Sequence, residues 1–348
     1  MTADRSTPGG DTPVLEVEGL TVEIDVPAGR LHAVRNVDLS VARGETLCIV
    51  GESGCGKSMT ALGILGLLPR RGRMQARRLR LEGSDLLAMG ASERAALLGD
   101  RMAMIFQDPM TSLNPVYTVG NQLEEIYLRH GKGGRKEARE RAEYLLEKVG
   151  ITAAGRRLGQ YPHQLSGGLR QRVMIAMALM CDPVLIIADE PTTALDVTIQ
   201  AQILRLLADL QTELHTALIL ITHDLGVVAR VADRVIVMYA GEVVETGPAD
   251  QIFATPLHPY TQGLLDCIPI PGRTERGSRL GAIPGMVPSL VGAIEGCQFR
   301  NRCTYAFDAC AGGSVPLRAL GPARGLRCLL QQAPARVERA RHPAGVTE

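Results

Sequence analysis

The stretch GESGCGKS at residues 51–58 decides the fold, because it matches the phosphate-binding pattern G-x-x-x-x-G-K-[ST] at every fixed position. An apolar run at 46–50 predicts a strand before it, and a second apolar run at 61–68 predicts a helix after it. A glycine-rich turn between a strand and a helix points backbone N–H groups at phosphate oxygens, and the helix N-terminus adds a partial positive charge. The sequence therefore predicts a nucleoside triphosphate site.

Individual residues of this phosphate loop have expected roles. Lys57 is expected to reach the β- and γ-phosphates, and the Ser58 hydroxyl to bind Mg²⁺. Cys55 occupies a variable position, where the backbone supplies the contact. The loop residues predicted to contact the nucleotide are Gly51, Ser53, Gly54, Cys55, Gly56, Lys57, Ser58 and Met59.

The composition is that of a globular protein. The chain has 348 residues, 45% of them hydrophobic and 22% charged, which allows one large α/β domain and a smaller appendage. Its 38 basic and 37 acidic residues nearly cancel, and the basic residues form no stripe interleaved with aromatics, so we expect no nucleic acid partner. No apolar run reaches the roughly 18 residues that span a bilayer, and the polar N-terminus lacks the apolar centre of a signal peptide. We expect a cytosolic chain that partners hold at a membrane.

Two kinds of hydrophobic pattern follow each other along the chain. Residues 15–50 alternate apolar and polar side chains in short runs, which predicts antiparallel strands. Residues 184–239 alternate continuous apolar runs with helical stretches, which predicts a parallel sheet flanked by helices. The predicted fold class is therefore α/β, with a parallel-sheet core and an N-terminal antiparallel β subdomain.

The predicted domain organisation has four parts. The hydrophobic pattern weakens near residue 250 and prolines recur beyond it, which predicts a domain boundary there. The main domain is expected at 14–250, and a smaller C-terminal extension at 251–330. Both termini, 1–13 and 331–348, lack an apolar period and are expected to be disordered.

An apolar strand at 184–188 ends in two acids, Asp189 and Glu190. Ligands in parallel sheets bind at the carboxyl ends of the strands, so both acids are expected near the phosphate loop. Asp189 is placed to hold Mg²⁺, and Glu190 to polarise a water that attacks the γ-phosphate. The alternative is that the acids simply end a strand.

The stretch LSGGLRQR at 165–172 predicts a second anion site. Ser166 reads as a helix N-cap, and two glycines follow it before a long helix. Since the chain already has one phosphate loop, this second site is expected to face another molecule or another surface. An ordinary capped helix is the alternative.

Six motifs occur in the order of the ATP-binding cassette (ABC) family, which this chain resembles. They are the phosphate loop, Gln107 after a strand, the LSGG signature, the acid-tipped strand, Ala194-Leu195-Asp196, and His223. The resemblance implies the cassette fold of P-loop NTPases, with a RecA-like core and a helical subdomain at about 108–180. It also implies a second ABC ATPase subunit, identical or different, paired head to tail. ATP then lies between the phosphate loop of one subunit and the signature of the other.

The same resemblance implies roles for individual residues. Gln107 senses Mg²⁺ and the transmembrane partner, Glu190 is the general base, and His223 holds the γ-phosphate and orients the water. Asp196 lies at the dimer seam. The implied Mg²⁺ ligands are Ser58, Gln107 and Asp189, and the implied nucleotide contacts of the signature are Ser166, Gly167, Gly168 and Gln171.

Further segments narrow the resemblance to the ATPases of oligopeptide and dipeptide importers. They are QDPMTSLNP at 107–115, YPHQ at 161–164, HPYT at 258–261 and IPG at 283–285. The resemblance implies an ATP-hydrolysing subunit at the cytoplasmic face of the cell membrane, docked on two transmembrane permease subunits. An extracytoplasmic substrate-binding protein feeds those permeases. ATP-driven closure of the ATPase dimer switches permease access, and hydrolysis resets it.

Three alternatives stay open at this point. The same role for nickel or another small solute is one, because specificity lies in subunits that this chain does not contain. A non-transport ABC ATPase usually carries two cassettes or a long coiled coil, whereas this chain has one phosphate loop, one signature and no heptad run. A regulatory cassette without turnover is expected to lack Glu190 or His223, and both are present.

Four cysteines gather near the C-terminus in the spacing C-x5-C-x6-C-x17-C, at Cys297, Cys303, Cys310 and Cys328. Four thiolates suit either tetrahedral zinc or a [4Fe–4S] cluster, and the spacing does not choose between them. Unligated structural thiols are a third reading. The resemblance to peptide importers implies an iron–sulfur cluster, with Zn²⁺ as the alternative and a structural rather than catalytic role.

Overall fold

The computed structural model divides the chain into two compact units, each made of several sequence segments. The first comprises residues 1–19, 38–46 and 76–219, and the second comprises 20–37, 47–75 and 220–348. The structure describes residues 13–193, 195–267, 282–292, 295–321 and 323–330. The termini expected to be disordered, 1–13 and 331–348, fall outside these ranges apart from Pro13, as does Ala194.

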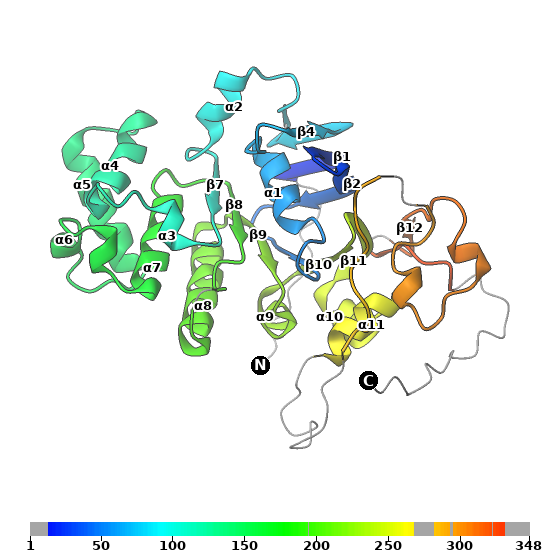
Figure 1. Cartoon of the computed structure of the whole chain (residues 1–348). Coiled ribbons are helices and arrows are strands. Elements are labelled where there is room, and N and C mark those ends of the chain that lie inside the picture. The colour runs from blue at the N-terminus through cyan, green and yellow to red at the C-terminus, as the bar shows by residue number, and fades with distance from the viewer. Residues whose placement is uncertain (1–12, 194, 268–281, 293–294, 322, 331–348) are drawn as a thin grey trace. The chain divides into compact units, whose positions relative to one another are not determined.

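The first unit contains two parallel strands, and its helices lie mostly between them in sequence (Figure 1). Strand β7 (Met102–Ile105) pairs in parallel with β8 (Leu185–Asp189). Every residue of β8 is buried, which accounts for its unbroken apolar run. Parallel neighbours need a long crossover connection, and here that connection forms a helical segment. The helices of this unit are α2 (Ala91–Leu97), α3 (Pro109–Ser112), α4 (Val119–Arg129), α5 (Arg135–Lys148), α6 (Ala154–Arg157), the 3₁₀ turn η1 (Pro162–Gln164), α7 (Gly167–Ala178) and α8 (Val197–Leu214).

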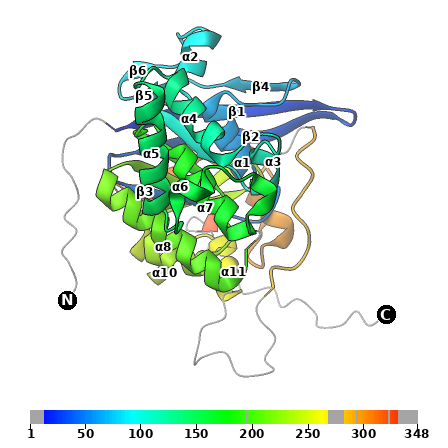
Figure 2. The same cartoon turned by 90° about the vertical axis from the view of Figure 1, so that its left-hand side faces the viewer.

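Helices α4, α5 and α7 pack on one another (Figure 2). The Thr118 side chain caps α4 by accepting from the Asn121 N–H, at 3.2 Å. In the strongly charged α5, Ala138 and Ala142 are buried on the packed side. These helices confirm the helical subdomain of the cassette fold, and α7 carries the signature segment at its N-terminus.

The second unit holds the phosphate loop and its supporting strands. Strand β3 (Thr46–Val50) pairs in parallel with β10 (Arg234–Tyr239), and the loop leads from β3 into α1 (Lys57–Leu65). The predicted strand at 46–50 is confirmed. The helix begins at Lys57, four residues before the apolar run. It ends at Leu65, and Gly66 takes the left-handed C-cap conformation with φ 73°.

Antiparallel strands from the C-terminal part of the chain extend this sheet. Strand β11 (Glu242–Pro248) follows β10 through Ala240 and Gly241, whose φ angles of 49° and 81° suit a two-residue hairpin turn. Strand β13 (Gly325–Leu326) pairs antiparallel with β11, and β12 (Arg318–Ala319) pairs with β13. The remaining elements of this unit are α9 (Leu225–Val231), α10 (Ala249–Ala254), α11 (Pro259–Asp266), and the 3₁₀ turns η2 (Arg300–Arg302) and η3 (Asp308–Cys310).

Long N-terminal strands contribute to both units. They are β1 (Leu15–Val26) and β2 (Gly29–Val41), and strand β9 (Ala217–Thr222) is divided between the units in the same way. In the first unit β1 pairs antiparallel with β5 (Arg78–Leu81), which pairs with β6 (Ser84–Asp85). In the second unit β1 pairs antiparallel with β4 (Gly72–Gln75). The antiparallel N-terminal strands are thus confirmed. Within the described ranges, no helix combines the length and the apolar character that crossing a bilayer requires.

Candidate nucleotide-binding site

The backbone of the phosphate loop favours glycine at three positions. The φ angles of Gly51, Gly54 and Gly56 are 152°, 78° and 103°. A Cβ on Gly51 would lie 2.3 Å from the Met238 carbonyl oxygen, and one on Gly56 would lie 2.4 Å from the Ala33 carbonyl oxygen. These close approaches to neighbouring backbone fix the turn, and the turn is the form that presents successive N–H groups to an anion.

Lys57 is folded into this loop. Its ammonium donates to the carbonyl oxygens of Gly51, at 2.8 Å, and Glu52, at 3.1 Å. Helix α1 starts at Lys57, and its N-cap, Gly56, offers no side chain to the first N–H groups. The positive end of the helix and the lysine therefore belong to the same loop, as phosphate binding requires.

The other loop residues differ in exposure. Ser53 and Gly54 are exposed, while Ser58 and Met59 are half-buried. Cys55 is fully buried, and that burial raises the pKa of its thiol. The Cys55 side chain therefore packs beneath the loop, consistent with a contact to nucleotide through its backbone.

The acid pair belongs to the first unit. Asp189 is buried at the end of β8, and Glu190 follows in the left-handed conformation with φ 43°. One carboxylate oxygen of Glu190 accepts from the Gln107 amide, at 3.3 Å, and from the Thr193 hydroxyl, at 2.8 Å. The structure thus brings Gln107 and Glu190 together. A strained backbone that holds a hydrogen-bonded carboxylate is common at functional sites.

The signature segment starts helix α7. Ser166 has extended backbone, and its hydroxyl accepts from the Leu169 N–H at 3.4 Å. Ser166 and Gly167 are exposed, while Gln171 is buried. A Cβ on Gly167 would make an ordinary contact of 3.7 Å to the Leu195 side chain. On Gly168 it would lie 3.1 Å from the Ile199 side chain.

Asp196 and His223 both adjoin helix starts. The Asp196 carboxylate caps α8 by accepting from the Thr198 and Ile199 N–H groups, at 3.1 and 3.0 Å. That cap accounts for an acid at this position without reference to a dimer. His223 is exposed directly after β9, and the next residue, Asp224, caps α9.

The predicted site residues thus divide between the units. Gln107, Asp189, Glu190, Asp196 and the signature belong to the first unit, and the phosphate loop and His223 belong to the second. The nucleotide and Mg²⁺ contacts assigned to them stay predictions.

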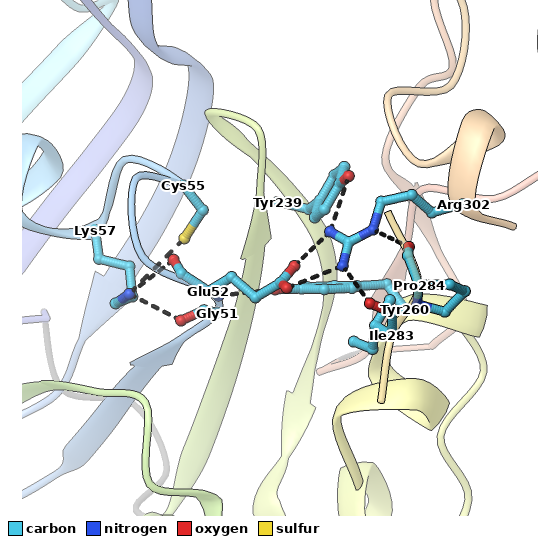
Figure 3. A network of polar contacts seen from close by, with 9 residues as sticks. All are labelled: Gly51, Glu52, Cys55, Lys57, Tyr239, Tyr260, Ile283, Pro284 and Arg302. Carbon is cyan, nitrogen blue, oxygen red and sulfur yellow. Dashed lines mark hydrogen bonds and ion pairs between the residues drawn. The ribbon is translucent and has the colours of Figure 1, made fainter. Parts of the chain in front are cut away.

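Sequence reasoning missed three partners of the site. Thr193 lies three residues after Glu190, so a hydroxyl one turn away was the available signal. Tyr260 and Arg302 contact the loop residue Glu52 from 208 and 250 residues further along the chain (Figure 3). A local sequence pattern cannot predict contacts between residues so far apart in the sequence.

The four cysteines near the C-terminus face one small cavity of about 20 Å³, which Phe299, Tyr305 and Phe307 also line. Burial is the main cause that raises the pKa of Cys297 and Cys303 to about 11, and the neighbouring thiols contribute to this rise. Backbone hydrogen bonds from the residue two positions later oppose this shift at Cys297, Cys303 and Cys328. At Cys328 the donor is the Leu330 N–H, at 3.4 Å. Within the described ranges, no group of three or more His, Cys, Asp or Glu side chains is arranged to hold a metal ion.

The sequence matches two known protein families. The family described as ABC transporter matches residues 34–193, and the one described as oligopeptide/dipeptide transporter, C-terminal region, matches residues 244–310. The chain is 50% identical over 315 residues to the dipeptide transport ATP-binding protein DppD of Escherichia coli (strain K12), covering 90% of this chain and 96% of that protein. It is 49% identical over 330 residues to a putative peptide import ATP-binding protein of Brucella abortus (strain 2308), covering 92% and 98%.

Solved structures share the fold. A bacterial ABC transporter cassette in dimeric form is 30% identical, with a TM-score of 0.59, and the match covers 68% of this chain and 98% of that one. A cassette dimer in a post-hydrolysis state bound to ADP and Pi is 29% identical, with the same coverage and TM-score. This chain therefore belongs to the ABC family of ATP-binding cassettes, and it is an ATPase. Within that family it carries the C-terminal region of the oligopeptide/dipeptide transporters.

Proposed function

We propose that this chain is the ATP-hydrolysing subunit of an importer for di- or oligopeptides. One observation carries the proposal: the chain matches both the cassette and the C-terminal transporter region, and its resemblance to a dipeptide transport ATP-binding protein runs over 96% of that protein. Nickel or another small solute remains the rival cargo, because this chain contains neither the permease nor the binding protein.

The experiment is transport in a strain that lacks the gene for this chain and requires one amino acid for growth. Supplying that amino acid only as a dipeptide should support growth when the wild-type chain is restored. The Lys57→Ala variant is the matched control, and it should not restore growth. Restored nickel uptake without dipeptide-dependent growth would overturn the peptide assignment.

The subunit is proposed to act as a head-to-tail dimer with a second ABC ATPase. Ser166 and Gly167 are exposed at the positive N-terminus of α7, and among the described residues no close contact requires glycine at position 167, which supports this assembly. The phosphate loop of one subunit and the signature of the other would enclose one ATP. The dimeric form of two solved relatives agrees with this assembly.

The hydrolysis step follows from the proposed roles. A water attacks the γ-phosphorus in line with its bond to the bridging oxygen of ADP, that bond breaks, and the water proton passes to Glu190. Gln107 and Thr193 both donate to one oxygen of the Glu190 carboxylate, which orients this base toward its proposed role. Lys57 neutralises the phosphates, and His223 orients the water. Ser58, Gln107 and Asp189 would hold Mg²⁺, whose charge stabilises the triphosphate.

A docking surface for the permease subunits is proposed at the segment between β7 and α4. Four large apolar side chains there are exposed, Phe106, Met110, Val116 and Tyr117, and Val116 is the most exposed at 71%. Exposed apolar side chains close together in sequence mark interaction surfaces. Docked there, the subunit would sit at the cytoplasmic face of the cell membrane, and the substrate-binding protein would act from the other side.

The cysteine cavity is proposed to hold a [4Fe–4S] cluster on Cys297, Cys303, Cys310 and Cys328. Four thiols around one cavity, with backbone N–H groups directed at three of them, suit thiolate ligands. A single zinc requires four ligand atoms that converge on bonds of about 2.3 Å. Zn²⁺ on the same four thiols stays the alternative. The cluster would supply a rigid crosslink.

Iron, sulfide and zinc analysis of protein purified without oxygen tests this assignment. The wild type should contain about four irons and four sulfides per chain, as the cluster type requires. Cys303→Ser should lose them, and the matched control Cys267→Ser, outside the cavity, should keep them. One zinc and no iron in the wild type would overturn the proposal.

A further inference from the structure

Glu52 of the phosphate loop is held by the C-terminal extension (Figure 3). Its backbone N–H donates to the Tyr260 hydroxyl at 2.8 Å. Its carboxylate accepts from both terminal nitrogens of Arg302, from Nη1 at 2.6 Å and from Nη2 at 3.0 Å. The loop residue next to Gly51 therefore has a bidentate ion pair to a residue 250 positions away.

The guanidinium group of Arg302 has several further contacts besides the ion pair with Glu52. Its Nε donates to the Pro284 carbonyl at 2.8 Å, and Nη2 also donates to the Ile283 carbonyl at 3.1 Å. The guanidinium carbon lies 5.7 Å from the ring centroid of Tyr239. The Arg302 side chain is 3% exposed, whereas that of Glu52 is 31% exposed. The hydrogen bond to Glu52 raises the pKa of Arg302, so this buried group is a permanent positive charge.

The charge of Glu52 matters because of where it lies. The loop presents its N–H groups to phosphate, and a free carboxylate within the loop would repel a triphosphate. The Glu52 carbonyl also accepts from the Lys57 ammonium, at 3.1 Å, so a displaced Glu52 would disturb that lysine. The buried Arg302 supplies the charge that cancels the repulsion.

We propose that Arg302 is a positioning residue for the nucleotide site, which neutralises Glu52 and thereby sets the affinity for ATP. Arg302 directly precedes Cys303, and its guanidinium carbon lies 5.9 Å from the ring centroid of Phe299. Cys303 and Phe299 both line the cysteine cavity. The cysteine-rich extension thus reaches the phosphate loop through one side chain, and this holds whatever the cavity contains.

Steady-state ATP hydrolysis by the full-length protein tests the proposal. Arg302→Gln should raise KM for ATP by about tenfold, because it leaves a carboxylate unneutralised in the loop, while kcat changes by less than about threefold. Adding Glu52→Gln to that variant removes the charge and should return KM to within about threefold of the wild type. Low salt should enlarge the defect of Arg302→Gln, because charges are then less screened.

Arg324→Gln is the matched control. It breaks another ion pair of the extension, between Arg324 and the buried Glu245 at 2.9 Å, so it should lower thermal stability and leave KM for ATP unchanged. Equal rises in KM from Arg302→Gln and Arg324→Gln would overturn the proposal, as would a double variant that stays at the KM of Arg302→Gln. If Arg302→Gln does not fold, Glu52→Gln decides alone. An unchanged or lower KM supports the charge role, and a tenfold rise overturns it.

Discussion

The phosphate loop and the signature segment both start a helix with glycines, but for different reasons. In the phosphate loop, a Cβ on Gly51 or Gly56 would collide with backbone of the same chain. In the signature, Gly167 is exposed, and a Cβ there would make an ordinary contact. Close backbone contacts thus require glycine at Gly51 and Gly56, whereas no such contact requires it at Gly167. The turn of the phosphate loop is therefore fixed by contacts within one chain, whereas Gly167 leaves open space on an exposed surface, as the proposed contact with a partner subunit requires.

The first prediction, with the largest expected effect, concerns the hydrolysis step and leaves both glycine segments unchanged. Glu190→Gln keeps the shape and one acceptor oxygen of the side chain but removes the base, so hydrolysis should fall by about 10²–10⁴-fold. ATP binding should persist, because the phosphate loop is untouched. Single-turnover hydrolysis and equilibrium ATP binding check the two parts. Wild-type turnover by this variant would remove Glu190 from the role of base.

The second prediction concerns a substitution that distorts the phosphate loop. Gly56→Ala places a side chain at φ 103° and 2.4 Å from the Ala33 carbonyl, so the loop must shift and ATP affinity should fall by about 100-fold. Gly54→Ala is the control, because its Cβ meets nothing within 4 Å, although φ is also positive at 78°. Calorimetric titration with ATP should show a smaller loss for this control. Equal losses would mean that strain alone, and not the collision, controls the loop.

The third prediction concerns the signature glycine. Gly167→Ala should leave folding and ATP binding by the isolated chain intact, and alanine can raise helix stability by up to about 1 kcal/mol. Hydrolysis by the assembled ATPase should nevertheless fall by about tenfold or more, because the methyl group occupies the surface that faces the partner's nucleotide. Thermal unfolding, ATP titration and turnover are the three measurements. Normal turnover by this variant would contradict the proposed role of the signature and favour the alternative, an ordinary capped helix.

The fourth prediction, with the smallest expected effect, concerns the hydrogen bond between Tyr260 and Glu52 of the phosphate loop. Tyr260→Phe removes the acceptor of the Glu52 N–H, and one hydrogen bond contributes about 1 kcal/mol, so KM for ATP should rise by about fivefold. Tyr305→Phe is the control, because Tyr305 lines the cysteine cavity. A change of KM shared by both variants would indicate a general loss of the extension's structure.

Local patterns predicted much of this molecule. The strand at 46–50, the phosphate loop and the Asp189–Glu190 pair at the end of a buried strand follow from periodicity and turn chemistry, which act over a few residues. The Arg302–Glu52 pair could not be predicted, because it depends on how distant segments meet. The domain boundary near residue 250 stays a proposal. Strand β11 lies before that boundary in the sequence, β13 lies after it, and the two strands pair with each other.

The most direct test of the composite site is a cryo-EM structure of the assembled transporter, carrying Glu190→Gln and trapped with ATP. We expect Ser166 of this chain to lie about 3 Å, a hydrogen-bond distance, from the γ-phosphate of an ATP bound on the partner subunit's phosphate loop. A closed, ATP-loaded assembly in which Ser166 lies far from every γ-phosphate would contradict it.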